Sequence, residues 1–319
     1  MDVEAYLQAI GLTGAQLTNG AEPDSLKLIY SHHVRALPFS SVPIICGRPV
    51  DPDLDIAGIA DKMITKRWGG VCFEHVALLG AALKRLGFDV TYLGGEVWRD
   101  GWTPTNTHAS LLVSFSDQTQ YFCDVGFPLR PLEPLLLKDG REQTQSDGRV
   151  FLLEAEPLPE REAEAEGERG EGQGQCQAEA RCWGVHQLDK EGDFELRHRF
   201  RLRPCALSDF SGPVRDLASP GHRFSSGWIV AICRPDGALV TLATGPWAGS
   251  EVPEDKAKYV CRRVVAGGEG RSTQHVTTTA LMTRGSVGLQ FLAEREFRIR
   301  TEDLGCADLP HGEAGGAQA

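Results

Sequence analysis

The sequence has no apolar segment long enough to cross a membrane as a helix. Its longest uninterrupted apolar run, Trp228 to Cys233, is six residues, whereas a spanning helix needs about 20. The first residues, Met1 to Glu4, also lack the basic stretch and apolar core of a secretory signal. These absences favour a cytoplasmic protein without a membrane partner.

Positive charge is also scarce. The 319 residues include 33 Lys and Arg against 44 Asp and Glu, a net charge of -11. Much of the negative excess lies in residues 154–180, which hold nine glutamates and two arginines but no aromatic residue. We expect this stretch to be a solvated acidic insertion. The rest of the chain is mildly acidic and offers no basic face of the kind that nucleic acid requires.

The cysteines do not form the regular pattern of a disulfide-stapled protein. There are nine, an odd number, at irregular spacing, which favours a reducing compartment. The histidines at 32, 33 and 75 lack the cysteine or carboxylate spacing of a metal site. We therefore expect no bound metal.

The chain changes character at about residue 87. Apolar residues from Cys72 to Leu86 recur at intervals of four, three, four and three, which predicts a helix, and Gly87 stands where its left-handed cap belongs. Beyond Val90, short apolar runs separated by turns predict strands, most clearly at 107–115 and 120–125.

A later strand is predicted at 194–203 because apolar and basic residues alternate along it. His198 is the one polar residue on the apolar face, and four arginines (Arg197, Arg199, Arg201 and Arg203) occupy the other face. We interpret the basic face as solvated, with contact to an anionic ligand such as a nucleotide phosphate as the alternative.

Cys72 is the first candidate for chemistry. It follows two glycines and opens the predicted helix, so its sulfur should lie near the positive end of the helix dipole, where the pKa of a thiol falls and the reactive thiolate is favoured. A buried packing cysteine is the alternative interpretation.

His108 and Asp124 support the chemical interpretation. They lie on the two arms of a predicted hairpin whose turn is centred between residues 117 and 118, which makes them near neighbours across the strands. Asp124 could then hold one imidazole nitrogen of His108, as a catalytic triad requires. Sequence spacing alone does not bring Cys72 to this hairpin.

The segments around these residues resemble the arylamine N-acetyltransferase family. The resemblance is carried by Arg67 to His75 around the nucleophile, Thr107 to Val113 around the histidine, Asp124 to Phe127, and Leu37 to Phe39. It implies an α+β fold with a thiol-protease-like arrangement: a helical domain at 1–86 with the nucleophile, a β-barrel domain at 87–190 with the histidine and aspartate, and an α/β lid at 191–319.

The resemblance also implies an activity. An acetyl or related acyl group would pass from acyl-CoA to an arylamine, arylhydrazine or arylhydroxylamine through an acyl-cysteine on Cys72, as in xenobiotic metabolism. Acetyl-CoA would be a co-substrate, with no permanently bound cofactor, and the oligomeric state stays open. Phe39, Phe73, Thr107 and Phe127 would contact the acceptor, and Gly126 the coenzyme A.

Some positions depart from the family pattern. Ser40 and Ser41 replace a Glu-Asn pair, Val76 stands where Asn is common, and Pro128 replaces a glycine. These departures keep two alternatives open: an amide synthase of secondary metabolism that releases a carrier-bound acyl chain onto an amine, and a non-catalytic binding protein that retains the fold.

Overall fold

The computed structural model describes residues 1–17, 20–98, 101–128, 130–157, 181–189, 191–234, 236–250, 252–253, 256–266, 273–283, 297 and 299. Within these residues, no helix has both the length and the apolar character of a membrane span. Helices lead the chain and two antiparallel sheets follow, so the expected α+β class is confirmed.

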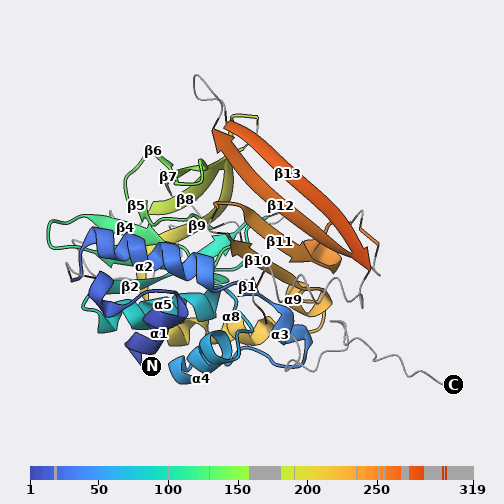
Figure 1. Cartoon of the computed structure of the whole chain (residues 1–319), viewed down its shortest axis with the longest axis horizontal. Coiled ribbons are helices and arrows are strands. Elements are labelled where there is room, and N and C mark those ends of the chain that lie inside the picture. The colour runs from blue at the N-terminus through green and yellow to red at the C-terminus, as the bar shows by residue number, and fades with distance from the viewer. Residues whose placement is uncertain are drawn as a thin grey trace.

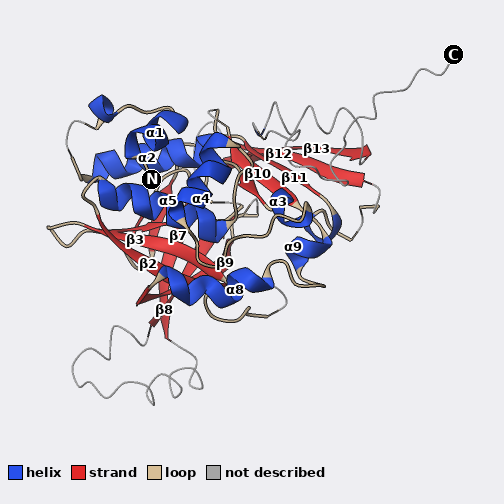
Figure 2. Cartoon of the chain, turned by 90° about the horizontal axis from the view of Figure 1, so that it is seen from below, coloured by secondary structure: helices blue, strands red, loops and turns tan. Residues whose placement is uncertain are grey.

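The first third of the chain is helical. Its elements are α1 (Val3–Ala9), η1 (Gly14–Gln16), α2 (Pro23–Ala36), β1 (Phe39–Ser40), α3 (Val42–Ile45), α4 (Ile56–Ala60), the π-helical turn η2 (Asp61–Thr65) and α5 (Cys72–Arg85). Helix α5 packs against α1, α2 and α4 on one side and against the first strands on the other. Figure 2 shows these helices gathered beside the strands. Gly87 has a φ of 89°, as the predicted cap requires.

The larger sheet has eight antiparallel strands and curls into a nearly closed barrel. Its strands are β2 (Asp89–Val97), β3 (His108–Ser114), β4 (Gln120–Cys123), β5 (Leu135–Leu136), β6 (Arg141–Thr144), β7 (Val150–Pro157), β8 (Arg181–Leu188) and β9 (Phe194–Cys205). Their spatial order is β5-β4-β3-β2-β9-β8-β7-β6. Strand β9 lies beyond the boundary at 190 that the sequence suggested and still completes this sheet, because it pairs with both β2 and β8.

The smaller sheet lies at the other side of the molecule (Figure 1). Its order is β1-β10-β11-β12-β13, with β10 (Ile229–Cys233), β11 (Leu239–Ala243), β12 (Lys256–Ala266) and β13 (Thr273–Thr283). The short elements η3 (Leu207–Phe210), α8 (Ser211–Asp216), α9 (Arg223–Ser226) and η4 (Gly245–Trp247) connect the two sheets or flank β11. Strand β1 comes from the helical part of the chain, so this sheet ties the two ends of the protein together.

The acidic stretch begins later than its composition suggested. Strand β7 continues through Pro157 and pairs with β8 from Phe151 to Pro157, so Glu154 and Glu156 belong to the sheet. Hydrogen bonding to β8 holds these two acidic residues in a strand despite the acidic composition of the segment. The rest of the stretch, residues 158–180, lies outside the described residues.

Alternation along the strands separates two cores. One face of β3, with Leu111 and Val113, packs in the cluster that includes α5, while Leu112 faces the interior cluster of the barrel. Phe122 of β4 and Phe200 of β9 belong to that same interior cluster. Side chains two positions before or after Leu112, Phe122 and Phe200 on these strands therefore also point toward the barrel interior.

Arg130 links the barrel to the helices from a fully buried position. Its guanidinium donates to three backbone carbonyl oxygens: that of Val125 at 3.2 Å, and those of Val34 and Leu37 near the end of α2 at 3.0 and 2.9 Å. These hydrogen bonds hold the loop that follows β4 against the helical part of the chain.

We expect Arg130→Met to reduce the free energy of unfolding by about 3 kcal/mol, because buried carbonyl groups lose charge-assisted partners. Thermal and urea denaturation measure this loss. Arg141→Met, at an exposed position on β6, is the control and should leave stability nearly unchanged. Equal stability of the two variants would show that the Arg130 hydrogen bonds are not structurally important.

Candidate active site

The loop before α5 brings Cys72 to the first position of the helix. Gly69 has a φ of 70°, and a Cβ there would lie 2.7 Å from the Pro38 carbonyl oxygen, so only glycine fits without strain. The Glu74 carboxylate accepts the backbone N–H of Val71 at 3.1 Å and pairs with Lys62 at 2.7 Å. Cys72 is thus presented at a rigid helix start.

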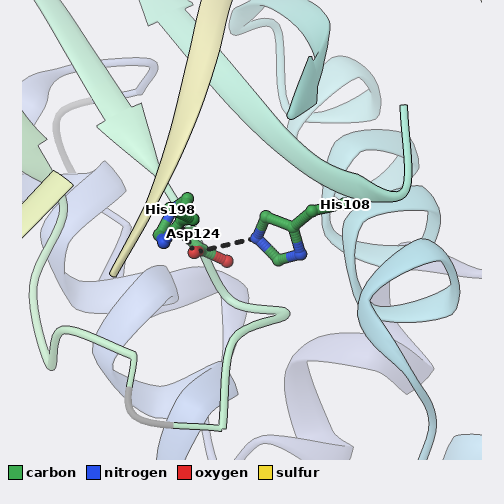
Figure 3. Close-up of side chains that lie close together, drawn as sticks. All are labelled: His108, Asp124 and His198. Atoms are coloured by element: carbon green, nitrogen blue, oxygen red, sulfur yellow. Dashed lines mark hydrogen bonds and ion pairs between the residues drawn. The ribbon is translucent and has the colours of Figure 1, made fainter. Parts of the chain in front are cut away.

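His108 and Asp124 meet as the hairpin predicted. Strands β3 and β4 pair with Leu111 opposite Cys123, and the Nε2 atom of His108 lies 3.0 Å from Oδ2 of Asp124 (Figure 3). Both side chains are almost completely buried. Cys72 lies close enough to His108 to raise the pKa of the imidazole, and both residues line the same cavity. The structure therefore pairs His108 with Asp124 and places Cys72 nearby, as the sequence predicted.

The loop after β4 is shaped around the Asp124 carboxylate. Its Oδ1 atom accepts the backbone N–H groups of Gly126 at 2.9 Å and Phe127 at 3.0 Å. Gly126 lies directly against Cys72, because a Cβ at this position would lie 2.5 Å from the Cα atom of Cys72. The contact fixes the distance between the barrel loop and the start of α5.

Charge in the site follows from this burial and pairing. Burial alone would lower the pKa of His108, but the Asp124 charge, the hydrogen bond between them and the nearby Cys72 together raise it to about 10. Burial opposes ionisation of Asp124 as well, yet the two histidines that contact it hold its pKa well below the usual range. The site therefore favours an imidazolium beside the cysteine at neutral pH.

His198 is a further member of the site that the sequence did not assign. Its Nε2 atom lies 3.0 Å from the same Oδ2 atom of Asp124 (Figure 3). Burial lowers the pKa of His198, and the nearby Asp124 carboxylate opposes that shift, so the neutral form is favoured. The sequence indicated this position, because His198 is the one polar residue on the apolar face of β9 and lies two positions before the interior residue Phe200.

A cavity of about 370 Å³ opens over Cys72 and His108, within the size range of small-molecule sites. Phe39 and Phe127 line it, together with Phe224 and Trp247 from the second half of the chain. The rings of Phe39 and Phe224 are 6.3 Å apart, and those of Phe224 and Trp247 are 4.8 Å apart. These side chains form an aromatic wall beside Cys72.

The other predicted contact residues divide into two groups. Thr107 and Gly126 line the cavity, whereas Phe73 is absent from its lining and is fully buried against Phe210, with ring centroids 5.5 Å apart. Phe73 points away because it follows Cys72 by one residue on the helix. Among the departures from the family pattern, Pro128 lines the cavity; Ser40 and Ser41 are buried and do not.

The arginines of β9 do not share one face. The pairing of β8 with β9 shifts between Val185 and His186, so Arg197 is an extra residue in a β-bulge and lines the active-site cavity. Arg199 lies behind the sheet, 5% exposed, with its guanidinium 2.6 Å from the carboxylate of Glu96. The predicted solvated basic face is therefore partly a buried ion-pair network.

Further cations face the cavity from other parts of the chain. Arg223 comes from α9, and Lys258 and Arg262 come from β12. One carboxylate, Glu195, also lines the cavity and pairs with Arg197 at 3.0 Å. The described lining thus combines an aromatic wall with an excess of positive charge.

Comparison with known proteins defines the class. Residues 24–260 match the family described as N-acetyltransferase. The chain is 35% identical over 284 residues to the chicken (Gallus gallus) arylamine N-acetyltransferase, pineal gland isozyme NAT-3, a match that covers 86% of this chain and 92% of that protein. It is 34% identical to human (Homo sapiens) arylamine N-acetyltransferase 1, over 74% of this chain and 79% of that protein.

Solved structures agree in fold. The arylamine N-acetyltransferase of Mycobacterium marinum in complex with CoA aligns with a TM-score of 0.72 at 24% identity, over 95% of both chains. The chain therefore belongs to the arylamine N-acetyltransferase family. Members of this family are acyl-CoA-dependent acetyltransferases, and acetyl-CoA serves as their co-substrate.

We expect Gly126→Ala to reduce acetyl transfer to an aniline about a hundredfold, because the new methyl group would push the loop away from Cys72 and displaced reacting groups lose alignment. Steady-state rates measure the effect. Gly212→Ala is the matched control, since a Cβ there would meet nothing within 4 Å. An active Gly126→Ala variant would contradict the role of this contact.

Proposed function

We propose that this protein transfers an acetyl group from acetyl-CoA to an arylamine, arylhydrazine or arylhydroxylamine through an acyl-cysteine on Cys72. The observation that carries the proposal is that Cys72 and His108 line one aromatic cavity, while Asp124 holds the His108 imidazole at 3.0 Å. It unites an activated nucleophile, a proton carrier and a group that orients that carrier.

The first half-reaction forms the acyl-enzyme. The Cys72 thiolate attacks the thioester carbonyl carbon, a new carbon–sulfur bond forms, and the bond to the coenzyme A sulfur breaks. The departing coenzyme A thiolate takes the proton of the His108 imidazolium. Since Cys72 occupies the first position of α5, the positive end of the helix dipole helps to stabilise negative charge that develops on the carbonyl oxygen.

The second half-reaction releases the amide. The acceptor amine attacks the acyl-cysteine carbonyl carbon, the carbon–sulfur bond to Cys72 breaks, and neutral His108 takes the amine proton. This step restores the thiolate–imidazolium pair. Because coenzyme A departs before the amine reacts, the scheme predicts ping-pong kinetics.

The cavity lining supports both substrates. Phe39, Phe127 and Phe224 offer ring faces to an aromatic acceptor, in accord with a role in xenobiotic metabolism. Arg223, Lys258 and Arg262 offer positive charge to the phosphates of acyl-CoA. We also propose a cytoplasmic location, because a reducing compartment preserves a catalytic thiolate.

The test is the intact mass of the protein after brief incubation with acetyl-CoA. Wild type should gain one acetyl group, and an added aniline should remove it as the acetylated amine. Cys72→Ala lacks the nucleophile and should gain none. Cys233→Ala, which alters a buried free cysteine outside the cavity lining, is the control and should still be acylated.

Two other outcomes would replace the proposal. Acylation by a carrier-bound acyl thioester and not by acetyl-CoA would identify an amide synthase. An unacylated wild type whose Cys72 reacts with iodoacetamide no faster than an ordinary thiol would identify a non-catalytic member of the fold.

We further propose that His198 is a positioning residue that acts through Asp124. Because Asp124 raises the pKa of His108 to about 10, the imidazolium persists through neutral pH and is lost as pH rises through that value. A loosened Asp124 would lower this pKa and weaken the thiolate–imidazolium pair. We therefore expect His198→Leu to slow alkylation of Cys72 at neutral pH about tenfold. The pH at which alkylation becomes fast should rise.

Alkylation by iodoacetamide as a function of pH measures both effects without a substrate. His198→Gln keeps an N–H donor toward Asp124 and should restore most of the rate. A purely structural role would reduce thermal stability and leave the pH profile where it is in wild type.

A further inference from the structure

A second cluster of ionisable side chains lies on the barrel away from Cys72. Strands β7 and β8 pair with Glu154 opposite Gly184, with Leu152 opposite His186 one step along the sheet face. Since residues two apart on a strand share a face, Glu154, Glu156 and His186 project from the same side. Two adjacent strands of the sheet thus supply one site.

The distances within the cluster are short but do not correspond to hydrogen bonds. The Nε2 atom of His186 lies 3.6 Å from a carboxylate oxygen of Glu154 and 3.8 Å from one of Glu156. One potential ligand atom from each residue lies within 4.8 Å of the other two. Two carboxylates held this close repel each other unless a cation lies between them.

The imidazole is a preformed part of the cluster. His186 is 9% exposed, and its buried Nε2 atom has no hydrogen-bond partner. The ring lies over Gly184, where a Cβ would come within 2.6 Å of that same nitrogen. A buried nitrogen without a partner costs free energy, which a ligand at this atom would offset.

We propose that Glu154, Glu156 and His186 bind a divalent transition-metal ion of the zinc class. Zinc bonds to imidazole nitrogen and carboxylate oxygen are about 2.0–2.2 Å long, so ligand atoms of a tetrahedral site lie about 3.4 Å apart. The observed 3.6 and 3.8 Å are close to that value. Water would complete the coordination, because both carboxylates are partly exposed.

The expected consequence is structural. The ion would join β7 and β8 near the end of β7 at Pro157 and the start of β8 at Arg181. The sequence did not suggest this site because its ligands do not follow one another at a recognisable spacing. The pairing of β7 with β8 brings His186 to the two glutamates. From its acidic composition, the region was expected to be a solvated insertion without a bound ligand.

Zinc titration of the full-length chain by calorimetry tests the proposal. The Cys72→Ala background removes the catalytic thiolate as a competing ligand. We expect one zinc ion per chain, with an affinity that falls more than about tenfold in Glu154→Gln, Glu156→Gln and His186→Gln. Glu22→Gln, at an exposed position before α2, is the control and should bind zinc as the background does.

A second readout guards against misfolding and other ligands. Glu154 and Glu156 are partly exposed, so their amide variants should fold even if His186→Gln does not. Cobalt(II) in place of zinc should show an absorption spectrum without a thiolate charge-transfer band. Unchanged zinc affinity in both glutamate variants, an absence of binding in the background protein, or a thiolate band would each overturn the proposal.

Discussion

The buried negative charge of Asp124 is the constraint on which the rest of the structure depends. A carboxylate without solvent must be surrounded by donors, and here two backbone N–H groups and two histidines surround it. The same requirement shapes the loop after β4, so that Gly126 lies against Cys72. Tyr30 of α2 adds a hydrogen bond to the Asp124 backbone carbonyl at 2.7 Å. Satisfying one charge therefore assembles the helix, the strands and the loop.

The ends of several helices and strands meet at this carboxylate. Helix α5 begins at Cys72, β3 begins at His108, and β4 ends one residue before Asp124. Strand β9 passes alongside and contributes His198. The smaller sheet closes the other side, because Phe39 of β1 pairs with β10 and also bridges to Gly70 beside the nucleophile. Elements that are distant in sequence thus share the boundary of one cavity.

Much of the site could be predicted because its signals are local. The helix start at Cys72 and the hairpin that pairs His108 with Asp124 each depend on residues close together in the chain, and the structure confirms both. Phe224 and Trp247 could not be placed in the cavity from spacing, since long-range packing brings them there. The position of Arg197 was mispredicted because a bulge interrupts the alternation on which the argument relied. Phe73 was also mispredicted, because this aromatic neighbour of Cys72 packs into the core and not into the cavity.

The bulge at Arg197 has a consequence for how this enzyme can change over time. Without it, every arginine of the strand would face the same side, and any change in charge would affect one environment. With one extra residue, β9 contributes Arg197 to the catalytic cavity and Arg199 to an ion pair behind the sheet. A change at position 197 therefore alters the charge of the cavity and leaves the ion pair of Arg199 with Glu96 in place. A single inserted residue thus separates the charge that faces the cavity from the charge that is paired behind the sheet.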